Sequence, residues 1–190
     1  MRLPPLTLVI GGASSGKSAF AEALVDLSGR PRVYVATAEA RDAEMERKIA
    51  AHRARREGRG WHVVEEPLDL AGALLRVGSG AAILVDCATF WLTNRMLGGW
   101  DVDEAAEGLC SALAQVAPPV VIVTNDVSGG VVPDNALARA FRGAQGRLNQ
   151  RLAAEAGLVV QVTAGLPLVL KGEAGAIAGW DGGSGGARTW

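Results

Sequence analysis

Residues 11–18 read GGASSGKS and fit the spacing G-x-x-x-x-G-K-S, a pattern that binds nucleotide phosphates. An apolar run, LTLVI, precedes them and a helix-like run, AFAEALVDL, follows, so we expect a strand, a turn and a helix. Such a turn directs several backbone N–H groups into one concavity at the positive end of a helix dipole. An ordinary Gly/Ser loop is the alternative, but the spacing, the Lys-Ser ending and the flanking runs favour a nucleoside triphosphate site.

The residue types in this motif suit the chemistry of phosphate binding. Lys17 is expected to reach the β- and γ-phosphates, and Ser18 to place its hydroxyl on Mg²⁺. Asp86, after the apolar run AAILV, is the expected second magnesium ligand, because this ion combines one or two protein oxygens with phosphates. An N-cap of the following helix is the alternative for Asp86. The predicted phosphate site comprises Gly11, Gly12, Ala13, Ser14, Ser15, Gly16, Lys17 and Ser18.

Five short β-branched runs alternate with helix-sized segments, at 7–10, 32–36, 82–86, 120–124 and 158–162. Continuous apolar strands separated by helices are typical of a parallel sheet covered on both faces, and right-handed crossovers make it a doubly wound α/β domain. A run at 166–170 is a candidate antiparallel edge strand. The sequence thus predicts a single P-loop NTPase (RecA-like) domain over 1–170, and a glycine-rich, loosely held tail over 171–190.

Polar residues follow four of the predicted strands. The phosphate motif follows the first, residues 36–39 follow the second, Asp86 ends the third and residues 124–126 follow the fourth. In an open parallel sheet, ligands bind outside the carboxyl ends of the strands. We therefore expect these four segments to converge on one crevice.

The segment after the second strand, RDAEMERKIAAHRARRE, has helical periodicity, with Met45, Ile49 and His52 on one face. A histidine on such a stripe is usually a hydrogen-bonded core residue, and an arginine run is usually solvated. However, this helix leaves the same sheet edge as the phosphate motif, so an imidazole flanked by guanidinium groups could meet a polyphosphate. Neutral imidazole is a competent nucleophile at phosphorus, and neighbouring cations favour its neutral form. The residues alone leave this choice open.

Composition limits the classes of protein. The chain has 190 residues, 49% of them hydrophobic, and a formal net charge of -1, which fits one domain and argues against a basic nucleic-acid-binding protein. Its apolar runs are far shorter than the roughly 20 residues of a membrane span, so we expect a cytoplasmic enzyme. Cys87 and Cys110 have no metal-binding spacing and are expected to be core residues without chemistry.

Taken in order, several blocks resemble the bifunctional adenosylcobinamide kinase / adenosylcobinamide-phosphate guanylyltransferase family of cobalamin biosynthesis. The resemblance covers residues 6–170 and rests on GGASSGKS, YVATAEA, DAEMERKIAAHRARR, WHVVEEP, ILVDCATFWLTN, VTNDVSGGVVPDN and ARAFRGAQGRLNQRLA. It implies that the enzyme phosphorylates adenosylcobinamide with a nucleoside triphosphate, ATP or GTP. It then transfers GMP from GTP to adenosylcobinamide phosphate and releases pyrophosphate. The resemblance also implies a homo-oligomer, with a trimer expected.

The same resemblance assigns site residues. It places a guanylylated histidine at His52, so His52 and Lys17 are the expected catalytic residues. Glu65 would otherwise be read as a surface carboxylate; here it could accept hydrogen bonds from a guanine edge or from ribose hydroxyls, and the sequence does not choose between them. Besides the phosphate motif, the implied nucleotide contacts are Ala36, Thr37, Ala38, Arg53, Ala54, Arg55, Arg56, Glu65 and Asp86.

The chain departs from the family pattern at three positions. Asp126 and Ser128 stand in a block that usually reads N-E-V-G, and Gly143 replaces the aspartate of F-R-D. These changes concern corrinoid positioning and kinase efficiency more than nucleotide binding. The long helix nearby is expected to run from Pro133 to about residue 156, with Pro133 in its first turn. Its expected buried stripe is Leu137, Phe141, Leu148 and Leu152, and its arginines, Arg139, Arg142 and Arg147, are either solvated or face the substrate phosphate.

Two other functions share these features. A P-loop small-molecule kinase without guanylyltransferase activity would use the same phosphate motif and give His52 no covalent role. A RecA-like ATPase motor would share the fold. The chain lacks the basic and aromatic platform that binds single-stranded nucleic acid, so no nucleic-acid partner is expected.

Overall fold

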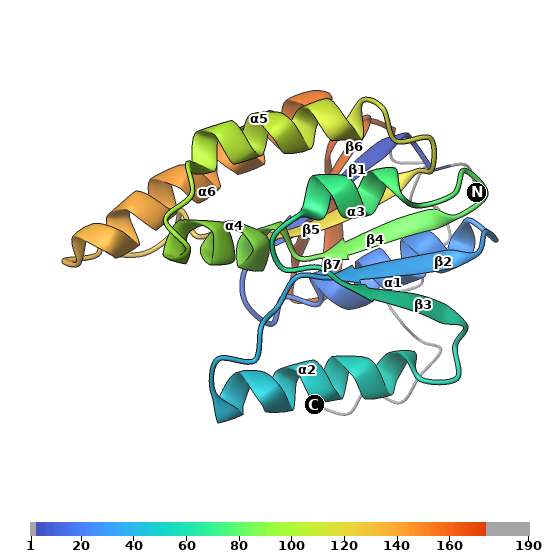
Figure 1. Cartoon of the computed structure of the whole chain (residues 1–190), viewed down its shortest axis with the longest axis horizontal. Coiled ribbons are helices and arrows are strands. Elements are labelled where there is room, and N and C mark those ends of the chain that lie inside the picture. Colours follow the sequence, from blue (N-terminus) through green and yellow to red (C-terminus); the bar gives the residue numbers. More distant parts are fainter. Residues whose placement is uncertain (1–2, 174–190) are drawn as a thin grey trace.

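The computed structural model describes residues 3–173, which form a seven-stranded sheet with helices on both faces (Figure 1). The strand order is β3-β2-β4-β5-β1-β6-β7, with parallel pairing throughout except between β6 and β7. The strands are β1 (Leu6–Gly11), β2 (Arg32–Ala36), β3 (Trp61–Glu65), β4 (Ala82–Asp86), β5 (Val120–Asn125), β6 (Leu158–Thr163) and β7 (Leu166–Lys171). The predicted α/β fold, with its mostly parallel sheet and antiparallel edge strand, is confirmed.

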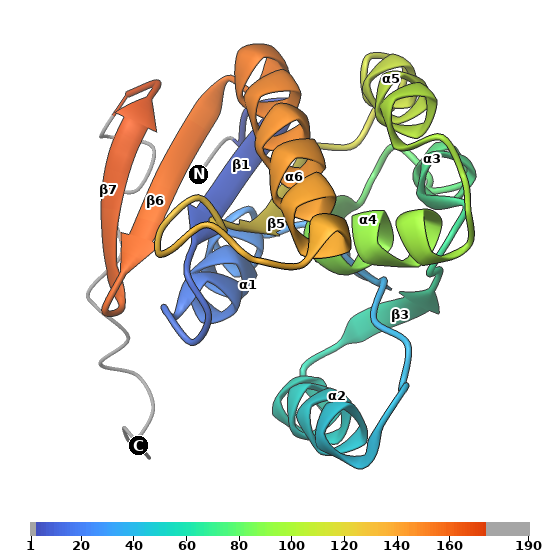
Figure 2. The ribbon, with the colours of Figure 1, turned by 90° about the vertical axis from the view of Figure 1, so that its left-hand side faces the viewer.

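The helices divide between the two faces of the sheet. They are α1 (Lys17–Leu27), α2 (Ala43–Arg56), α3 (Leu70–Leu75), α4 (Ala88–Leu97), α5 (Val102–Leu113) and α6 (Ala136–Glu155). Figure 2 shows α1 on one face and α3, α5 and α6 on the other. Phe20 and Leu24 of α1 are buried in one core, and Leu148 and Leu152 of α6 in the other. Strands β1, β4 and β5 lie between these cores, which is why their sequences are continuous apolar runs.

Helix α2 stands apart from the sheet, beside β3 (Figures 1 and 2). The Asp42 side chain begins it by accepting a hydrogen bond from the Met45 N–H at 2.7 Å. Within Ala43–Arg56, Arg56 is the one fully buried residue. The helix therefore contributes little to either core.

The five predicted parallel strands did not include β3. It lies at the edge of the sheet beside β2, and its residues are half-buried or exposed. The segment WHVVE consequently lacks the uninterrupted apolar run that marks a central strand.

Helix α6 begins later than predicted. Asn135 caps it by accepting hydrogen bonds from the N–H groups of Leu137 and Ala138, so Pro133 lies before the helix and not in its first turn. The first turns project beyond the sheet (Figure 1), and the side chain of Leu137 is 53% exposed. Leu137 was therefore wrongly placed in the buried stripe, which consists of the partly buried Phe141 and the buried Leu148 and Leu152.

The predicted tail over 171–190 needs one correction. Lys171 is the last residue of β7, and its ammonium donates to the carbonyls of Ala153 and Ala154 near the end of α6. Residues 174–190 lie outside the described residues. Among the helices of residues 3–173, none is long and apolar enough to cross a membrane.

Candidate active site

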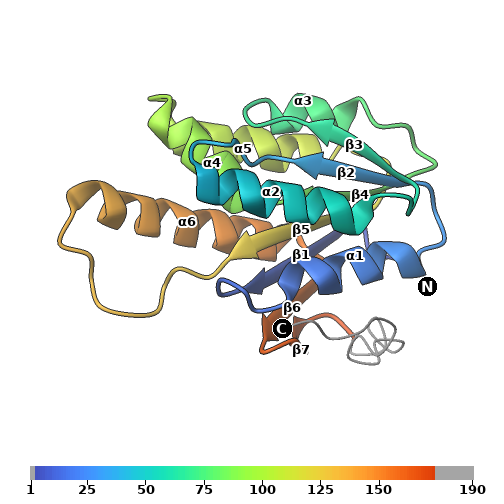
Figure 3. The same cartoon turned by 90° about the horizontal axis from the view of Figure 1, so that it is seen from below.

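The predicted phosphate motif forms a tight turn between β1 and α1, here called the phosphate loop (residues 11–18; Figure 3). Gly16 adopts φ +91° just before the helix, a conformation that favours glycine. A Cβ at Gly11 would lie 2.5 Å from the Val162 carbonyl oxygen and 2.6 Å from the Ser15 hydroxyl. Gly11 and Gly16 are therefore required by the backbone path of the loop, whereas a Cβ at Gly12 would meet no other atom within 4 Å.

Lys17 and the turn between β6 and β7 hold the phosphate loop. The Lys17 ammonium donates to the Gly12 carbonyl at 2.9 Å, so in this state it folds back over the loop. Burial lowers the pKa of Lys17, although the nearby Cys87 and Asp86 act in the opposite direction. The Gly165 N–H donates to the Ser15 carbonyl at 2.8 Å, a contact between distant segments that sequence reasoning missed.

Asp86 lies at the carboxyl end of β4 and is held by Tyr34. The Tyr34 hydroxyl donates to Asp86 Oδ2 at 2.9 Å. Burial raises the pKa of Tyr34 far above its ordinary value, and the Asp86 carboxylate raises it further, so the hydroxyl stays a donor. Cys87 occupies the N-cap position of α4, so the interpretation of Asp86 as that cap is wrong. Burial raises the pKa of the Cys87 thiol to about 12, which agrees with a core residue without chemistry.

Thr37 is a buried structural residue beside Asp86. Its hydroxyl donates to the Cys87 carbonyl at 2.6 Å and accepts from the Cys87 N–H at 2.8 Å. Its own carbonyl accepts from the Asn94 side chain at 2.8 Å. The Thr37 hydroxyl is thus fully used inside the protein, whereas its neighbours Ala36 and Ala38 line the cavity described next.

A cavity of about 490 Å³ lies between α2 and the carboxyl ends of β2 and β3. Met45, Ile49 and His52 line it from α2, so the apolar stripe of this helix faces the cavity and not the core. Glu65 and Asp86 also line it. His52 is therefore not a buried core histidine, which was one of the two interpretations that the sequence left open.

His52 faces the same carboxylate that Tyr34 holds. Its Nδ1 lies 3.7 Å from Asp86 Oδ2 and 3.1 Å from the guanidinium of Arg55, which can only donate. Burial lowers the pKa of His52 below its ordinary value; Arg55 and Arg56 act in the same direction, while Asp86 opposes them. Burial and the two guanidinium groups thus favour the neutral form of the His52 imidazole.

The four residues that follow His52 point to different places. Arg53 lines the cavity and forms an ion pair with Glu65. Arg56 is buried, and its guanidinium lies 3.5 Å from the centre of the Tyr34 ring. Ala54 lines a separate hollow beside Trp61, together with Arg53 and Arg56, and is not among the residues that line the cavity at His52.

Glu22 belongs to this region but was absent from the predicted site. It lies on α1, and its carboxylate is 5% exposed and faces Arg55 at 3.6 Å, Arg56 at 3.9 Å and Arg59 at 3.4 Å. Burial raises the pKa of Glu22, while these three guanidinium groups act to lower it. No local signal marked it, because α1 holds two acidic residues, Glu22 and Asp26, and the sequence does not show which of them meets the arginines of α2.

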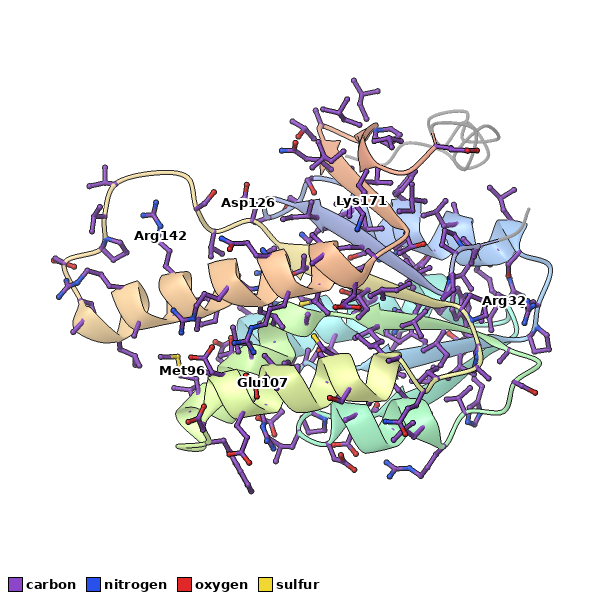
Figure 4. The ribbon with its side chains drawn as sticks, turned by 90° about the horizontal axis from the view of Figure 1, so that it is seen from above. Arg32, Met96, Glu107, Asp126, Arg142 and Lys171 are labelled. Atoms are coloured by element: carbon purple, nitrogen blue, oxygen red, sulfur yellow. The ribbon has the colours of Figure 1, made fainter. Side chains whose placement is uncertain are left out.

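The loop between β5 and α6 contacts the phosphate loop. The Asp126 N–H donates to the Gly11 carbonyl at 3.1 Å, and its carboxylate accepts from the Ser128 N–H and hydroxyl. Arg142 donates to the carbonyls of Ser128 and Val131 (Figure 4 labels Asp126 and Arg142). These bonds fix the conformation of the loop that contains Asp126 and Ser128, two of the positions that depart from the family pattern.

Arg139 and Arg147, the other two arginines that the sequence singled out on α6, also bind groups of the protein itself. Arg139 donates to the carbonyls of Pro133 and Asp134. Arg147 forms an ion pair with Asp103 at 3.1 Å. In this structure all three arginines thus bind groups within the protein, and a role at the substrate phosphate stays a prediction.

A phosphate loop with Lys17 after β1, a carboxylate at the end of β4, two strands away, and a histidine beside a cavity form the arrangement expected of a P-loop nucleotide-binding transferase. Comparison with known proteins gives the family. Residues 7–170 match the model of the family "Cobinamide kinase / cobinamide phosphate guanyltransferase". The chain belongs to this family and is an enzyme of cobalamin biosynthesis with kinase and guanylyltransferase activities.

Individual relatives agree with this assignment. The chain is 43% identical over 169 residues to the bifunctional adenosylcobalamin biosynthesis protein CobP of Pseudomonas aeruginosa, covering 87% of this chain and 97% of that protein. It is 38% identical over 183 residues to CobU of Salmonella typhimurium, covering 87% and 99%. A structural match to the RadB recombinase covers 84% of this chain and 74% of that chain, with 20% identity and a TM-score of 0.47.

Proposed function

We propose that one crevice carries out both transfers, with His52 as a covalent relay in the second. The observation that supports this proposal is the position of His52, 3.7 Å from Asp86 on a cavity at the carboxyl edge of the sheet. The phosphate loop and Asp86 would serve the nucleotide in both steps. His52 would act in guanylyl transfer alone.

In the kinase step, the phosphate loop holds the triphosphate, ATP or GTP, through its backbone N–H groups. Lys17 leaves the Gly12 carbonyl and binds the β- and γ-phosphates. Phosphoryl transfer to the hydroxyl of adenosylcobinamide then depends mainly on positioning and on stabilisation of negative charge.

The residues present fit a Mg²⁺ ion bound together with phosphates. The described residues contain no group of three or more His, Cys, Asp or Glu side chains that could hold a metal. Mg²⁺ at phosphates needs only one or two protein oxygens, and Ser18 and Asp86 are the candidates, because one oxygen of Asp86 is free of Tyr34. The ion would neutralise charge on the phosphates.

In the guanylyl step, neutral His52 attacks the α-phosphorus of GTP. In this structure Arg55 donates to Nδ1, so the neutral ring carries its proton on Nε2 until Arg55 turns toward the phosphates. The proton then lies on Nδ1, where it donates a hydrogen bond to Asp86, and Nε2 has the lone pair that attacks. The Nε2–P bond forms as the bond from the α-phosphorus to its bridging oxygen breaks, and that electron pair leaves with pyrophosphate. Asp86 stabilises the ring cation that results. An oxygen of adenosylcobinamide phosphate then displaces His52 and takes the GMP group.

The cavity beside His52 is the proposed site of the guanosine. Ala36, Ala38, Met45 and Ile49 supply apolar surface for a base, and the Glu65 carboxylate can accept hydrogen bonds from its N–H groups. Arg53 already pairs with Glu65 and would keep that carboxylate oriented. Binding of GTP would use this pocket and the phosphate loop together.

The corrinoid is too large for a cavity of about 490 Å³, so it would lie across the open side of the crevice. A homo-oligomer, with a trimer favoured, would supply further surface from a neighbouring subunit. We place the enzyme in the cytoplasm, where its nucleotide substrates are.

Assays of the two steps with two variants test the proposal. With adenosylcobinamide, ATP, GTP and Mg²⁺, His52→Ala should still phosphorylate the corrinoid but transfer no GMP. Lys17→Ala should lose both activities, because the same phosphate loop serves both. A His52→Ala enzyme that still makes the GDP derivative of cobinamide would exclude His52 as the relay.

A further inference from the structure

Helix α2 carries His52 but packs little against the rest of the protein. Most of its residues are exposed, and it stands apart from the sheet (Figure 2). Its cavity-facing residues, Met45 and Ile49, are half-buried and leave space between the helix and the strands. The position of His52 must therefore depend on contacts near the end of the helix.

Those contacts converge on Glu22 of α1. Glu22 is 4% exposed and lies among the guanidinium groups of Arg55, Arg56 and Arg59, at 3.6, 3.9 and 3.4 Å. Arg55 and Arg56 belong to the last turn of α2. Removing a carboxylate from water is costly, and a buried ion pair is weak evidence for stability. A role in fixing the position of α2 explains why the carboxylate is there.

The same arginines also contact residues of the active site. Arg56 stacks on Tyr34 at 3.5 Å, and the Tyr34 hydroxyl holds Asp86 at 2.9 Å. Arg55 lies 3.1 Å from His52 Nδ1. Glu22 also lies five positions beyond Lys17 on the same rigid helix. A single carboxylate thus connects the helix that begins at the phosphate loop with the helix that carries His52.

We infer that Glu22 is a positioning residue that docks α2 on α1 and so presents His52 to the α-phosphorus of a nucleotide in the phosphate loop. This inference rests on the proposed role of His52. Phosphoryl transfer to the corrinoid uses the phosphate loop and Asp86, and Tyr34 of β2 holds Asp86 by its own hydrogen bond, so this transfer does not need α2 in this place. Loss of Glu22 should therefore separate the two activities.

The test compares Glu22→Gln with the control Asp26→Asn. Asp26 also lies on α1 and pairs with Arg32 and Arg59, both at 2.6 Å, but it is not paired with the arginines of α2. Each protein is mixed with saturating GTP and Mg²⁺, and the single-turnover rate of GMP attachment is followed by intact mass. Phosphorylation of adenosylcobinamide by ATP is measured in parallel as the internal control for folding.

Glu22→Gln should slow GMP attachment about tenfold or more at saturating GTP, because loss of orientation acts on the rate and not on KM. Its kinase rate should stay within about twofold of wild type, and Asp26→Asn should match wild type in both assays. Hydrogen exchange should show faster exchange of the α2 amides in Glu22→Gln and not in Asp26→Asn. Unchanged attachment with unchanged α2 exchange, or an equal loss of both activities, would overturn the inference.

Two further outcomes of this experiment also have a defined meaning. If Glu22→Gln does not fold, Glu22→Asp replaces it, since this variant keeps the charge but withdraws it by one methylene, and the same separation is expected. If wild type forms no GMP adduct, the proposed role of His52 fails. In that case the α2 exchange rates still decide whether Glu22 docks the helix.

Discussion

Replacing Tyr34 by phenylalanine isolates one hydrogen bond at the centre of the site. The ring remains, so the stack with Arg56 at 3.5 Å and the edge contact with Trp61 are kept, but the 2.9 Å bond to Asp86 is lost. Tyr34 is 3% exposed and the Asp86 side chain 11%, so water replaces the lost donor poorly. A hydrogen bond to a charged group contributes about 1.5–3 kcal/mol. We expect the free energy of unfolding to fall by this amount and the Tm by about 3–12 °C.

The measurements are urea unfolding and the two activity assays. Because Asp86 serves both steps, Tyr34→Phe should lower kinase and guanylyl rates together, each by about tenfold, or roughly 1.4 kcal/mol. Tyr34→Leu should cost about 2 kcal/mol more in stability, since it also removes the buried cation–π contact. A Tyr34→Phe enzyme with wild-type stability and wild-type rates would refute the argument that this hydroxyl holds Asp86.

Three other predictions follow from single contacts. Gly11→Ala places a Cβ 2.5 Å from the Val162 carbonyl oxygen and should reduce nucleotide affinity at least about tenfold by calorimetry, whereas unchanged affinity would mean that the loop tolerates the shift. Thr37→Val leaves the Cys87 backbone groups without two buried hydrogen bonds and should lower the free energy of unfolding by about 1–3 kcal/mol; an equally stable variant would contradict this. Removal of Mg²⁺ with EDTA should abolish both activities, and added Mg²⁺ should restore them; full activity without divalent ions would argue against a magnesium site at Ser18 and Asp86.

Central parallel strands were predictable because both of their faces are buried. The bounds of β2 and β4 match the predicted runs at 32–36 and 82–86. The edge strand β3 was not predicted, because an edge position leaves WHVVE without an apolar run. The start of α6 was misplaced because Pro133 and Asn135 are both good helix-start residues, and the hydrogen bonds of Asn135 decide between them.

The site residues divide in the same way, into those that the sequence indicates and those that it does not. The phosphate loop and Asp86 were predicted from a local motif and a strand end, whereas His52 was left open by the residues alone and assigned by the family resemblance. Glu22 and Tyr34 read as ordinary helix and strand residues, since their roles arise from partners 34 and 52 positions away along the chain. Contacts of this kind are set by the packing of α1, α2 and β2 and leave no local pattern.

The most direct measurement of the central claim is the intact mass of the protein after incubation with GTP and Mg²⁺, for wild type and His52→Ala. The account predicts a GMP-sized gain in wild type that is acid-labile, as expected for a phosphorus–nitrogen bond, and no gain in the variant. Wild-type protein that binds GTP but gains no mass, or a variant that gains the same mass, would contradict the assignment of His52 as the guanylyl carrier.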